Sequence, residues 1–212
     1  MKLLGKTALV TGSAKGLGRR TALELARLGC DVVLNYVNSA REAEEIRAEI
    51  EALGRRAIAV RANVADPAEV ERLAREAEAQ MGGVDILVNN AGPYIHERRP
   101  FADYAPEEIH LLLQGNLTGP MLLDRLLLPG MRRKRWGRII HFGFGRAAEA
   151  PAWPHRAVYA AAKVALVSFT KTLAVEEAAH GITVNMVCPG DIRGEYKEKD
   201  IGDAADVRDG ES

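Results

Sequence analysis

Residues 7–18 read TALVTGSAKGLG: a short apolar run, then three glycines, then the start of a segment with helical period. Glycine lets the backbone turn tightly, and it lets an anionic group approach the N–H groups and the positive end of the following helix. The stretch therefore predicts a strand, a phosphate-binding loop and a helix that opens at Leu17. The alternative is an ordinary glycine-rich turn in a domain that binds no nucleotide.

The alternation of strand and helix continues along the chain. Short runs rich in Val and Ile alternate with longer helical segments, which is typical of βα units on a parallel sheet buried on both faces. We predict six strands, at Thr7–Val10, Asp31–Tyr36, Ala57–Arg61, Ile86–Val88, Arg138–Phe142 and Thr183–Val187. We predict helices at about 17–28, 40–53, 67–80, 106–133 and 153–179. The fold class is α/β, a doubly wound parallel sheet of the Rossmann type.

Composition limits the classes of partner. The chain has 212 residues, of which 47% are hydrophobic, and its 29 acidic and 29 basic residues balance. A balanced charge gives no overall field toward nucleic acid or an anionic membrane, so we expect neither as a partner. Cys30 and Cys188 stand far apart in apolar runs, as reduced core thiols do, and the first residues do not resemble a signal peptide. We expect a cytoplasmic protein.

The end of the chain has a different composition. From Glu195 to Ser212, 10 of 18 residues are charged and bulky apolar residues nearly vanish. Such a segment cannot bury enough apolar surface to offset the entropy lost on ordering. We therefore predict a single nucleotide-binding and catalytic domain over 1–194, and a mobile tail or a truncated substrate loop over 195–212.

The end of the second strand bears on which nicotinamide cofactor would bind. A site for NAD usually has an acidic residue there, which binds the ribose 2′-hydroxyl, but residues 34–39 read LNYVNS. Lys15, Asn38, Ser39 and Arg41 could instead receive a 2′-phosphate through charge-assisted hydrogen bonds. This pattern favours NADP(H) over NAD(H), unless Lys15 and Arg41 are solvated surface charges.

Tyr159 and Lys163 stand four residues apart in a helical segment, so their side chains share one face. A phenol has a pKa of about 10, and an ammonium held close would lower it, so Tyr159 could donate and accept a proton near neutral pH. Taken alone, the pair could equally be a contact on a helix surface.

Several further motifs occur in a fixed order. They are Thr11 to Gly18, Asn63-Val64, the N-N-A-G run from Asn89 to Gly92, Asn116, Tyr159 with Lys163, and Pro189-Gly190. In this combination the chain resembles the short-chain dehydrogenase/reductase family over nearly its whole length, and most nearly members that reduce 3-oxoacyl groups on acyl carrier protein. The resemblance implies a sheet of order 3-2-1-4-5-6-7.

The resemblance also implies roles. Tyr159 would exchange a proton with the substrate oxygen, Lys163 would lower the pKa of Tyr159 and bind the nicotinamide ribose, and Asn116 would hold a water-filled proton path. Asn63 would meet the adenine edge, where the family more often has aspartate. The implied cofactor-binding residues are Gly12, Ser13, Lys15, Gly16, Leu17, Gly18, Asn38, Ser39, Asn63, Val64, Asn90, Ala91, Gly92, Lys163, Pro189, Gly190 and Ile192. No metal site is implied.

The chain departs from the family pattern near Tyr159. The family has a serine or threonine after the fifth strand that binds the substrate oxygen, but alignment on that strand places Phe144 there. Counting back from Tyr159 reaches Arg146 or Ala147 instead, and residues 138–156 contain no Ser or Thr. Losing such a donor costs about 2.7–4 kcal/mol, which predicts a slow enzyme. His141, His155 or Arg146 could substitute for it, or be ordinary strand and loop residues.

A second departure is the length of the chain. Family members continue to a seventh strand and about 250 residues, whereas this chain stops in the substrate loop, so we read the seventh strand as missing. The sixth strand would then be an apolar sheet edge, which needs a covering partner if the chain is not simply incomplete. The resemblance implies a homodimer or homotetramer built partly from the helices at 106–133 and 153–179.

These observations lead to one function and one rival. The leading hypothesis is an NADP(H)-dependent oxidoreductase that moves hydride between nicotinamide and a carbonyl or alcohol substrate, such as a 3-oxoacyl thioester or a small ketone. The rival is a nucleotide-binding family member without catalysis that serves in sensing or assembly. Tyr94, Phe142, Phe144 and Trp153 could line an apolar substrate pocket, or they could be packing residues.

Overall fold

A computed structural model of the chain describes residues 2–190, so the predicted tail and Ile192 lie outside the described part. Six parallel strands form one sheet in the order β3-β2-β1-β4-β5-β6. Their bounds are β1 Thr7–Val10, β2 Asp31–Tyr36, β3 Ala57–Arg61, β4 Ile86–Asn89, β5 Gly137–Phe142 and β6 Ile182–Val187. The predicted doubly wound α/β fold is confirmed, and each predicted strand lies within one residue of its place.

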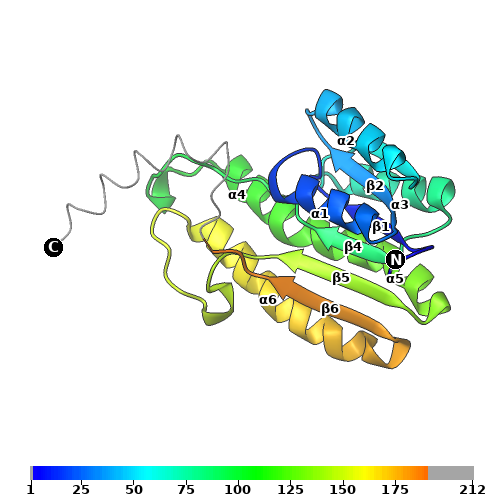
Figure 1. The fold of residues 1–212 in the computed structure, drawn as a ribbon. Helices are drawn as coiled ribbons and strands as arrows, with labels where there is room; N and C mark the ends of the chain where they lie inside the picture. The colour runs from blue at the N-terminus through cyan, green and yellow to red at the C-terminus, as the bar shows by residue number, and fades with distance from the viewer. Residues whose placement is uncertain (1, 191–212) are drawn as a thin grey trace.

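Helices cover the sheet (Figure 1). The α-helices are α1 Gly16–Arg27, α2 Ala40–Ala52, α3 Pro67–Met81, α4 Pro106–Leu113, α5 Gly119–Lys134 and α6 Ala157–Glu177. One core cluster joins Val10 and Leu34 of the sheet to α1 and α2. The other joins Leu9 and Ile139 to α3, α5 and α6. Because successive strand residues face opposite sides, the continuous apolar runs seen in the sequence serve both cores.

The predicted helix at 106–133 is wrong in one respect, because it is interrupted. Between α4 and α5 the chain widens into a π-helical segment, η2, at Gln114–Thr118. Pro120 has no backbone N–H, so the carbonyl of Asn116 lacks its usual donor four residues later and the ring of Pro120 crowds it. The side chain of Asn116 also donates to the Leu112 carbonyl at 3.0 Å, inside the widened turn. Such π segments gather at functional sites.

The predicted helix at 153–179 is also too long at its beginning. It starts at Ala157 and ends at Glu177, followed by a 3₁₀ turn, η4, at Ala178–His180. Trp153 precedes Pro154, which disfavours helical geometry, and His155 has a left-handed φ of +63°. The segment between β5 and α6 is therefore a loop, which contains the short 3₁₀ turn η3 at Ala147–Glu149.

The segment Ala157–His180, which contains α6, is apolar and long enough to cross a membrane by length and composition, with a mean hydropathy of 1.4 over its most apolar window. In the fold its buried residues pack inward. Leu173 joins the same core cluster as Ile139, Ile182 and Val184 of β5 and β6. Its apolar character is thus explained by its place against the sheet.

Gly119, the first residue of α5, provides a test of how closely this helix packs against the turn after β3. A Cβ at Gly119 would overlap the Val64 carbonyl oxygen and approach the Gln114 carbonyl oxygen at 2.9 Å, and neither backbone group can move freely. We expect Gly119→Ala to lower the free energy of unfolding by about 2 kcal/mol or more. Urea denaturation followed by circular dichroism measures this change.

Gly130→Ala in the same helix is the matched control. Its Cβ would meet only the ends of the flexible Glu78 and Arg133 side chains, at 3.3 and 3.7 Å. Because alanine favours the helix, we expect a change of no more than about 1 kcal/mol, in the stabilising direction. Equal effects of the two substitutions would contradict the packing argument.

Candidate active site

The carboxyl ends of β1 and β4 are joined by hydrogen bonds at the point where strand order reverses. The Thr11 hydroxyl accepts from the backbone N–H groups of Asn90 and Ala91 at 3.0 and 2.9 Å, and it donates to the Val88 carbonyl at 3.3 Å. The Asn90 side chain donates to the carbonyls of Thr11 and Gly12 at 2.8 and 3.2 Å. The glycine loop and the N-N-A-G turn therefore lie together at the switch point, where open α/β sheets bind ligands.

The glycine loop has the backbone that its sequence predicts. Gly12 and Gly16 have φ values of +61° and +55°, which favour glycine. A Cβ on Gly18 would overlap the Gly12 carbonyl oxygen, so only glycine lets α1 approach this closely. Helix α1, which includes Leu17, begins with no side-chain cap and no acidic residue in its first turn. Its first N–H groups are thus suited to a pyrophosphate.

Ser13 is a correction to the predicted cofactor contacts. Its side chain is fully buried, and its hydroxyl accepts from the Asn35 N–H at 2.9 Å and donates to the Asn35 carbonyl at 3.3 Å. Asn35 in turn accepts from the Gly12 N–H at 3.1 Å. The Ser13 hydroxyl therefore fixes the loop to β2, and both of its hydrogen bonds in this structure go to Asn35.

The charges predicted to bind a 2′-phosphate are paired with acids in this structure. Lys15 lies 3.0 Å from Glu42, and Arg41 lies 3.1 Å from Glu45, all on the surface. Asn38 is exposed and Ser39 half-buried where β2 leads into α2, and Ser39 makes no capping bond through its side chain. The solvated-surface interpretation thus describes Lys15 and Arg41 as they stand, although surface pairs of this kind are weak enough to exchange partners.

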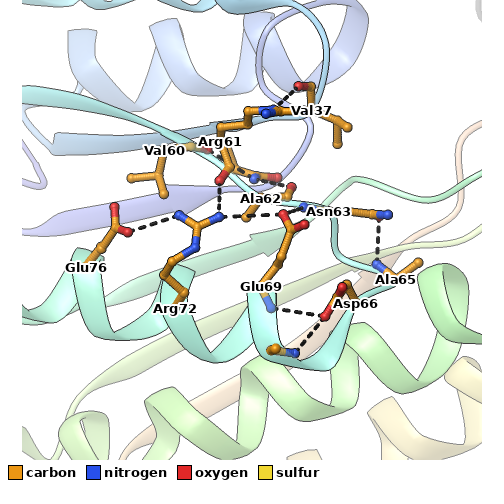
Figure 2. Close-up of polar contacts among 12 residues, drawn as sticks. Val37, Val60, Arg61, Ala62, Asn63, Ala65, Asp66, Glu69, Arg72 and Glu76 are labelled. Atoms are coloured by element: carbon orange, nitrogen blue, oxygen red, sulfur yellow. Dashed lines mark hydrogen bonds and ion pairs between the residues drawn. The ribbon is translucent and has the colours of Figure 1, made fainter.

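Arg61 is a cation that the sequence reasoning missed. It ends β3, and its Nε donates to the Val37 carbonyl at 3.0 Å, beside Asn38 and Ser39 (Figure 2). Among residues 2–190 it makes no ion pair. Arg61 lies beside Val37 because Tyr36 and Arg61 are paired in the parallel sheet. Its position therefore follows from the order of the strands, and no local sequence motif marks it.

Asn63 and its neighbours form a stable turn after β3 (Figure 2). The Asn63 Oδ1 accepts from the Ala65 N–H at 3.0 Å, and Glu69 accepts from the Asn63 N–H at 2.8 Å. Asp66 caps α3 by accepting from the N–H groups of Ala68 and Glu69, as its position before Pro67 predicts. Oδ1 keeps a second lone pair for an adenine amino group. Val64 is buried beneath this turn.

Tyr159 and Lys163 lie in the first two turns of α6, as predicted, but their electrostatics differ from the prediction. Lys163 is buried and donates to the Phe142 carbonyl at 2.8 Å, while its Nζ lies 5.8 Å from the centre of the Tyr159 ring. Burial, reinforced by Tyr94, raises the pKa of Tyr159 to about 12. Burial also lowers the pKa of Lys163 to about 8. The predicted lowering of the Tyr159 pKa is therefore wrong for this state, because desolvation of the phenolate outweighs the distant ammonium.

Asn116 is fully buried beside this pair. Its Nδ2 donates to the Pro93 and Leu112 carbonyls at 2.8 and 3.0 Å, whereas its Oδ1 has no hydrogen-bond partner among the described residues. Gly92 lies against this oxygen so closely that a Cβ would overlap it. An unpaired buried acceptor of this kind costs free energy, which is typical of a group that is paired in the working state.

An aromatic cluster occupies the position at which the family has a serine or threonine hydroxyl. Phe144 is 8% exposed, and its ring centre lies 4.8 Å from that of Trp153 and 6.3 Å from that of Tyr159. Trp153 also meets Tyr159 edge to face at 6.0 Å. The alignment that places Phe144 at this position is thus consistent with the geometry, and no hydroxyl replaces it on this side of Tyr159 within the described residues.

None of the three predicted substitutes takes that place. His141 is fully buried beneath the site, between Asp124 at 2.9 Å and Thr170 at 2.7 Å. Arg146 is exposed and pairs with Glu149 at 2.7 Å. His155 is exposed at the left-handed position before α6. The interpretation of all three as strand and loop residues is the one that the geometry supports.

Pro189 and Gly190 follow β6 and end the described part of the chain at the same edge of the sheet. A Cβ on Gly145 would lie 3.3 Å from the Gly190 Cα, so the loop after β5 passes close to this turn. Ile192, the last predicted cofactor contact, lies outside the described residues.

Comparisons with known proteins decide the family. The family model described as short chain dehydrogenase matches residues 6–203. The chain belongs to the short-chain dehydrogenase family. YtkK of Bacillus subtilis, a protein named as a provisional oxidoreductase, is 43% identical over 93% of this chain and 77% of its own length. A 3-oxoacyl-(acyl-carrier-protein) reductase of Synechocystis sp. is 40% identical over 92% of this chain and 78% of its own.

A solved structure of the family carries a cofactor. A short-chain dehydrogenase from Burkholderia cenocepacia in complex with NADP is 38% identical, with a TM-score of 0.82, over 92% of this chain and 78% of that one. The glycine loop described above fits such a group, because Gly12 and Gly18 leave bare backbone and α1 begins with free N–H groups. These residues and Lys163 would hold it, and the predicted resemblance to the family is confirmed.

The buried ammonium gives a test through pH. Between about pH 8 and its unfolded value of 10.5, Lys163 binds a proton more readily in the unfolded chain, so the folded state gains stability as pH rises through this window. We expect the free energy of unfolding of the wild type to rise by about 2 kcal/mol relative to that of Lys163→Met between about pH 7 and pH 10. Urea denaturation at a series of pH values measures the difference.

Lys171→Met, at an exposed position of the same helix, is the control. The change predicted for Lys163→Met is the excess over the change seen with this variant. No such excess would show that Lys163 is not desolvated in solution.

Proposed function

We propose that the protein is an NADP(H)-dependent reductase that transfers hydride to the carbonyl carbon of a 3-oxoacyl thioester or a small ketone, with Tyr159 as the proton donor. The observation that carries the proposal is the half-buried Tyr159 hydroxyl, which has no hydrogen-bond partner among the described residues and stands one helical turn from Lys163. NADPH, when bound, would supply the hydride.

The residues of the chain suit the reducing direction. Because burial holds the pKa of Tyr159 at about 12, the phenol keeps its proton near neutral pH and can give it to the substrate oxygen. Lys163, donating to the Phe142 carbonyl, has an ammonium ready for the nicotinamide ribose or for the phenolate that forms. The unpaired Asn116 Oδ1 could orient a water that returns a proton to Tyr159.

The substrate class rests on the relatives and on the cluster around Tyr159. The Synechocystis relative is named for a 3-oxoacyl group, which carries a ketone beside an apolar chain. Phe144 and Trp153 give the surroundings of Tyr159 the same apolar character. Both features support a ketone with an apolar substituent.

We also propose that the chain forms a homodimer or homotetramer. A groove between α5 and α6 is lined by the half-buried Met121, Leu122 and Phe169 and bordered by charged residues such as Arg125, Arg132 and Glu176. Val175 of α6 is 78% exposed. Apolar side chains gathered on two neighbouring helices suit the same face of a second copy.

The first prediction for this function concerns Tyr159. We expect wild-type protein to consume NADPH with at least one member of a panel of ketones and 3-oxoacyl thioesters, and Tyr159→Phe to lower kcat by about 10²–10⁴-fold while NADPH affinity stays within about twofold. Absorbance at the reduced nicotinamide band follows turnover, and fluorescence titration follows binding.

The rival function, nucleotide binding without catalysis, makes the opposite prediction in the same assay. It is favoured by Phe144, which replaces the expected hydroxyl. If wild type binds NADPH but turns over no ketone, and Phe144→Ser creates activity, the reductase proposal fails and the rival stands.

Cofactor choice gives a separate prediction. We expect NADPH to bind at least about tenfold more tightly than NADH, because charge-assisted hydrogen bonds from Arg61 and Lys15 to a 2′-phosphate would each contribute about 1.5–3 kcal/mol. Arg61→Ala and Lys15→Ala should each weaken NADPH about tenfold and leave NADH unchanged. Arg27→Ala, which removes an exposed arginine at the far end of α1, is the control. Equal affinities that respond to neither substitution would exclude this site for the phosphate.

A further inference from the structure

Tyr94 meets Tyr159 from a different element of the fold. It follows the N-N-A-G turn after β4, whereas Tyr159 lies on α6. The two rings are edge to face, with centres 5.0 Å apart and planes at 86°. Tyr94 is 37% exposed, so its side chain stands at the open side of the site and not inside the core.

Arg156 fixes the position of the Tyr94 hydroxyl. Its Nε donates to the Tyr94 Oη at 2.7 Å, and its guanidinium carbon lies 4.9 Å from the centre of the Tyr94 ring. The other guanidinium nitrogens donate to the backbone carbonyls of His96, Glu97 and His155 at 2.7, 2.8 and 2.9 Å. One side chain thus joins the segment after β4 to the loop before α6.

The guanidinium is unusual because no acid among residues 2–190 neutralises it. Arg156 is only 6% exposed, and its partners among the described residues are three carbonyls and one phenol. A buried cation normally has a carboxylate partner, because burial without one is costly. The partner that it holds at Nε is a hydroxyl whose oxygen can share developing negative charge.

The Tyr94 hydroxyl can still donate one hydrogen bond. It already accepts from Arg156, and among the described residues nothing accepts its proton. A phenol has one O–H to donate, and a hydroxyl that accepts from a cation becomes a stronger donor. Tyr94 therefore has a polarised O–H without an acceptor, on a ring that contacts the ring of Tyr159.

The loop that carries Arg156 is held in a strained shape. Arg146, Ala150 and His155 all have left-handed φ values, of +63°, +49° and +63°. Tyr104 donates from its hydroxyl to the His155 carbonyl at 3.1 Å, so the same carbonyl receives bonds from both Tyr104 and Arg156. Backbone strain of this kind is maintained where the surrounding structure fixes a functional group.

We propose that Tyr94, positioned by Arg156, is the second hydroxyl that binds the substrate's carbonyl oxygen and takes the place of the donor absent at Phe144. This inference rests on the proposed reductase function. Phe144 offers only an apolar ring on its side of Tyr159, so a donor must come from another element. Tyr94 is the polar side chain that contacts the Tyr159 ring from the segment after β4.

The two phenols have different parts in the step. As hydride adds to the carbonyl carbon, the carbon–oxygen double bond becomes single and the oxygen takes the proton from the Tyr159 O–H. The Tyr94 O–H bond stays intact and donates a hydrogen bond to the same oxygen while its negative charge develops. Tyr94 is thus a catalytic residue by contact with the substrate, and Arg156 is a positioning residue.

The test removes one oxygen atom. Tyr94→Phe keeps the ring and its edge-to-face contact with Tyr159, and we expect kcat with the best ketone of the panel to fall about 10²–10³-fold, with KM within about threefold. NADPH affinity should stay at the wild-type value, and the midpoint of thermal unfolding should fall by only a few degrees, because the buried Arg156 Nε loses its hydrogen-bond acceptor. Tyr104→Phe, which removes the other tyrosine hydroxyl that binds this loop, is the matched control and should keep kcat within about threefold.

A rescue experiment separates a chemical role from a structural one. Phe144→Ser places a hydroxyl on the other side of Tyr159, and in the Tyr94→Phe background it should raise kcat at least about tenfold, whereas it should not rescue Tyr159→Phe. Arg156→Lys keeps a cation but not the planar fork, and it should lower kcat more than it raises KM. A structural role for Tyr94 would leave the Phe144→Ser addition without effect.

The possible failures can be told apart. If the wild type reduces ketones, Tyr159→Phe does not, and Tyr94→Phe stays within about threefold of the wild type, this inference is wrong and the reductase function stands. If the wild type binds NADPH and reduces nothing, both are wrong. Should the double variant fail to fold, Tyr94→Phe against Tyr104→Phe still decides the question.

Discussion

The site depends on the hydrogen bonds that join the ends of β1 and β4 through Thr11 and Asn90. These two strands lie side by side in the sheet although 75 residues, 11–85, lie between the end of β1 and the start of β4. Ala8 pairs with Ile86 at the start of their shared register and Val10 with Val88 at its end. At the carboxyl ends of these strands, β1 leads into the glycine loop and β4 leads toward Tyr94. Because one hydroxyl and one amide fix both turns, the glycine loop and the segment that contacts Tyr159 share a single rigid base.

A second buried network supports the same region from below. Asn89 donates to Asp124 at 2.8 Å, Asp124 contacts His141 at 2.9 Å, and His141 contacts Thr170 at 2.7 Å. Thr170 donates its proton to the Leu166 carbonyl, so it accepts from Nδ1–H of His141, and Nε2 shares one proton with Asp124. Burial raises the pKa of Asp124, which His141 opposes. The network thus joins β4, β5, α5 and α6 beneath the site, and it explains why His141 cannot also serve the substrate.

The fold could be predicted from the sequence because its signals are local or periodic. The strands, the glycine loop and the Asp66 cap follow from patterns within a few residues, and each appears where expected. The break at Gln114–Thr118 follows from Pro120, a local signal that the sequence reasoning did not use. Left-handed residues such as His155 could not be predicted, since side-chain bonds from Tyr104 and Arg156 to its carbonyl help to hold that turn.

The candidate site was less predictable, because its errors concern partners that are distant in sequence. Ser13 was read as a ligand contact, but Asn35 of the neighbouring strand takes its hydroxyl. Arg61 and Arg156 carry no motif, and their importance appears only when parallel pairing or the loop before α6 brings them to a carbonyl or a phenol. The geometry of Tyr159 followed from helical spacing, whereas its pKa depended on burial by residues of two other segments, Tyr94 after β4 and Phe144 and Trp153 in the loop before α6.

That burial bears on the direction of the proposed chemistry. Tyr94, Phe144 and Trp153 enclose the Tyr159 ring and remove water from it, so the phenolate is disfavoured and the proton is held until charge develops on a neighbouring oxygen. An enzyme that began by removing a proton from an alcohol would need the opposite arrangement, with the phenolate stabilised before the substrate reacts. In the described geometry Lys163 is turned to the Phe142 carbonyl, and the buried guanidinium of Arg156 donates to Tyr94 instead. In the proposed reduction the proton would come from Tyr159, and the positive charge behind Tyr94 would stabilise the carbonyl oxygen as it becomes an alkoxide.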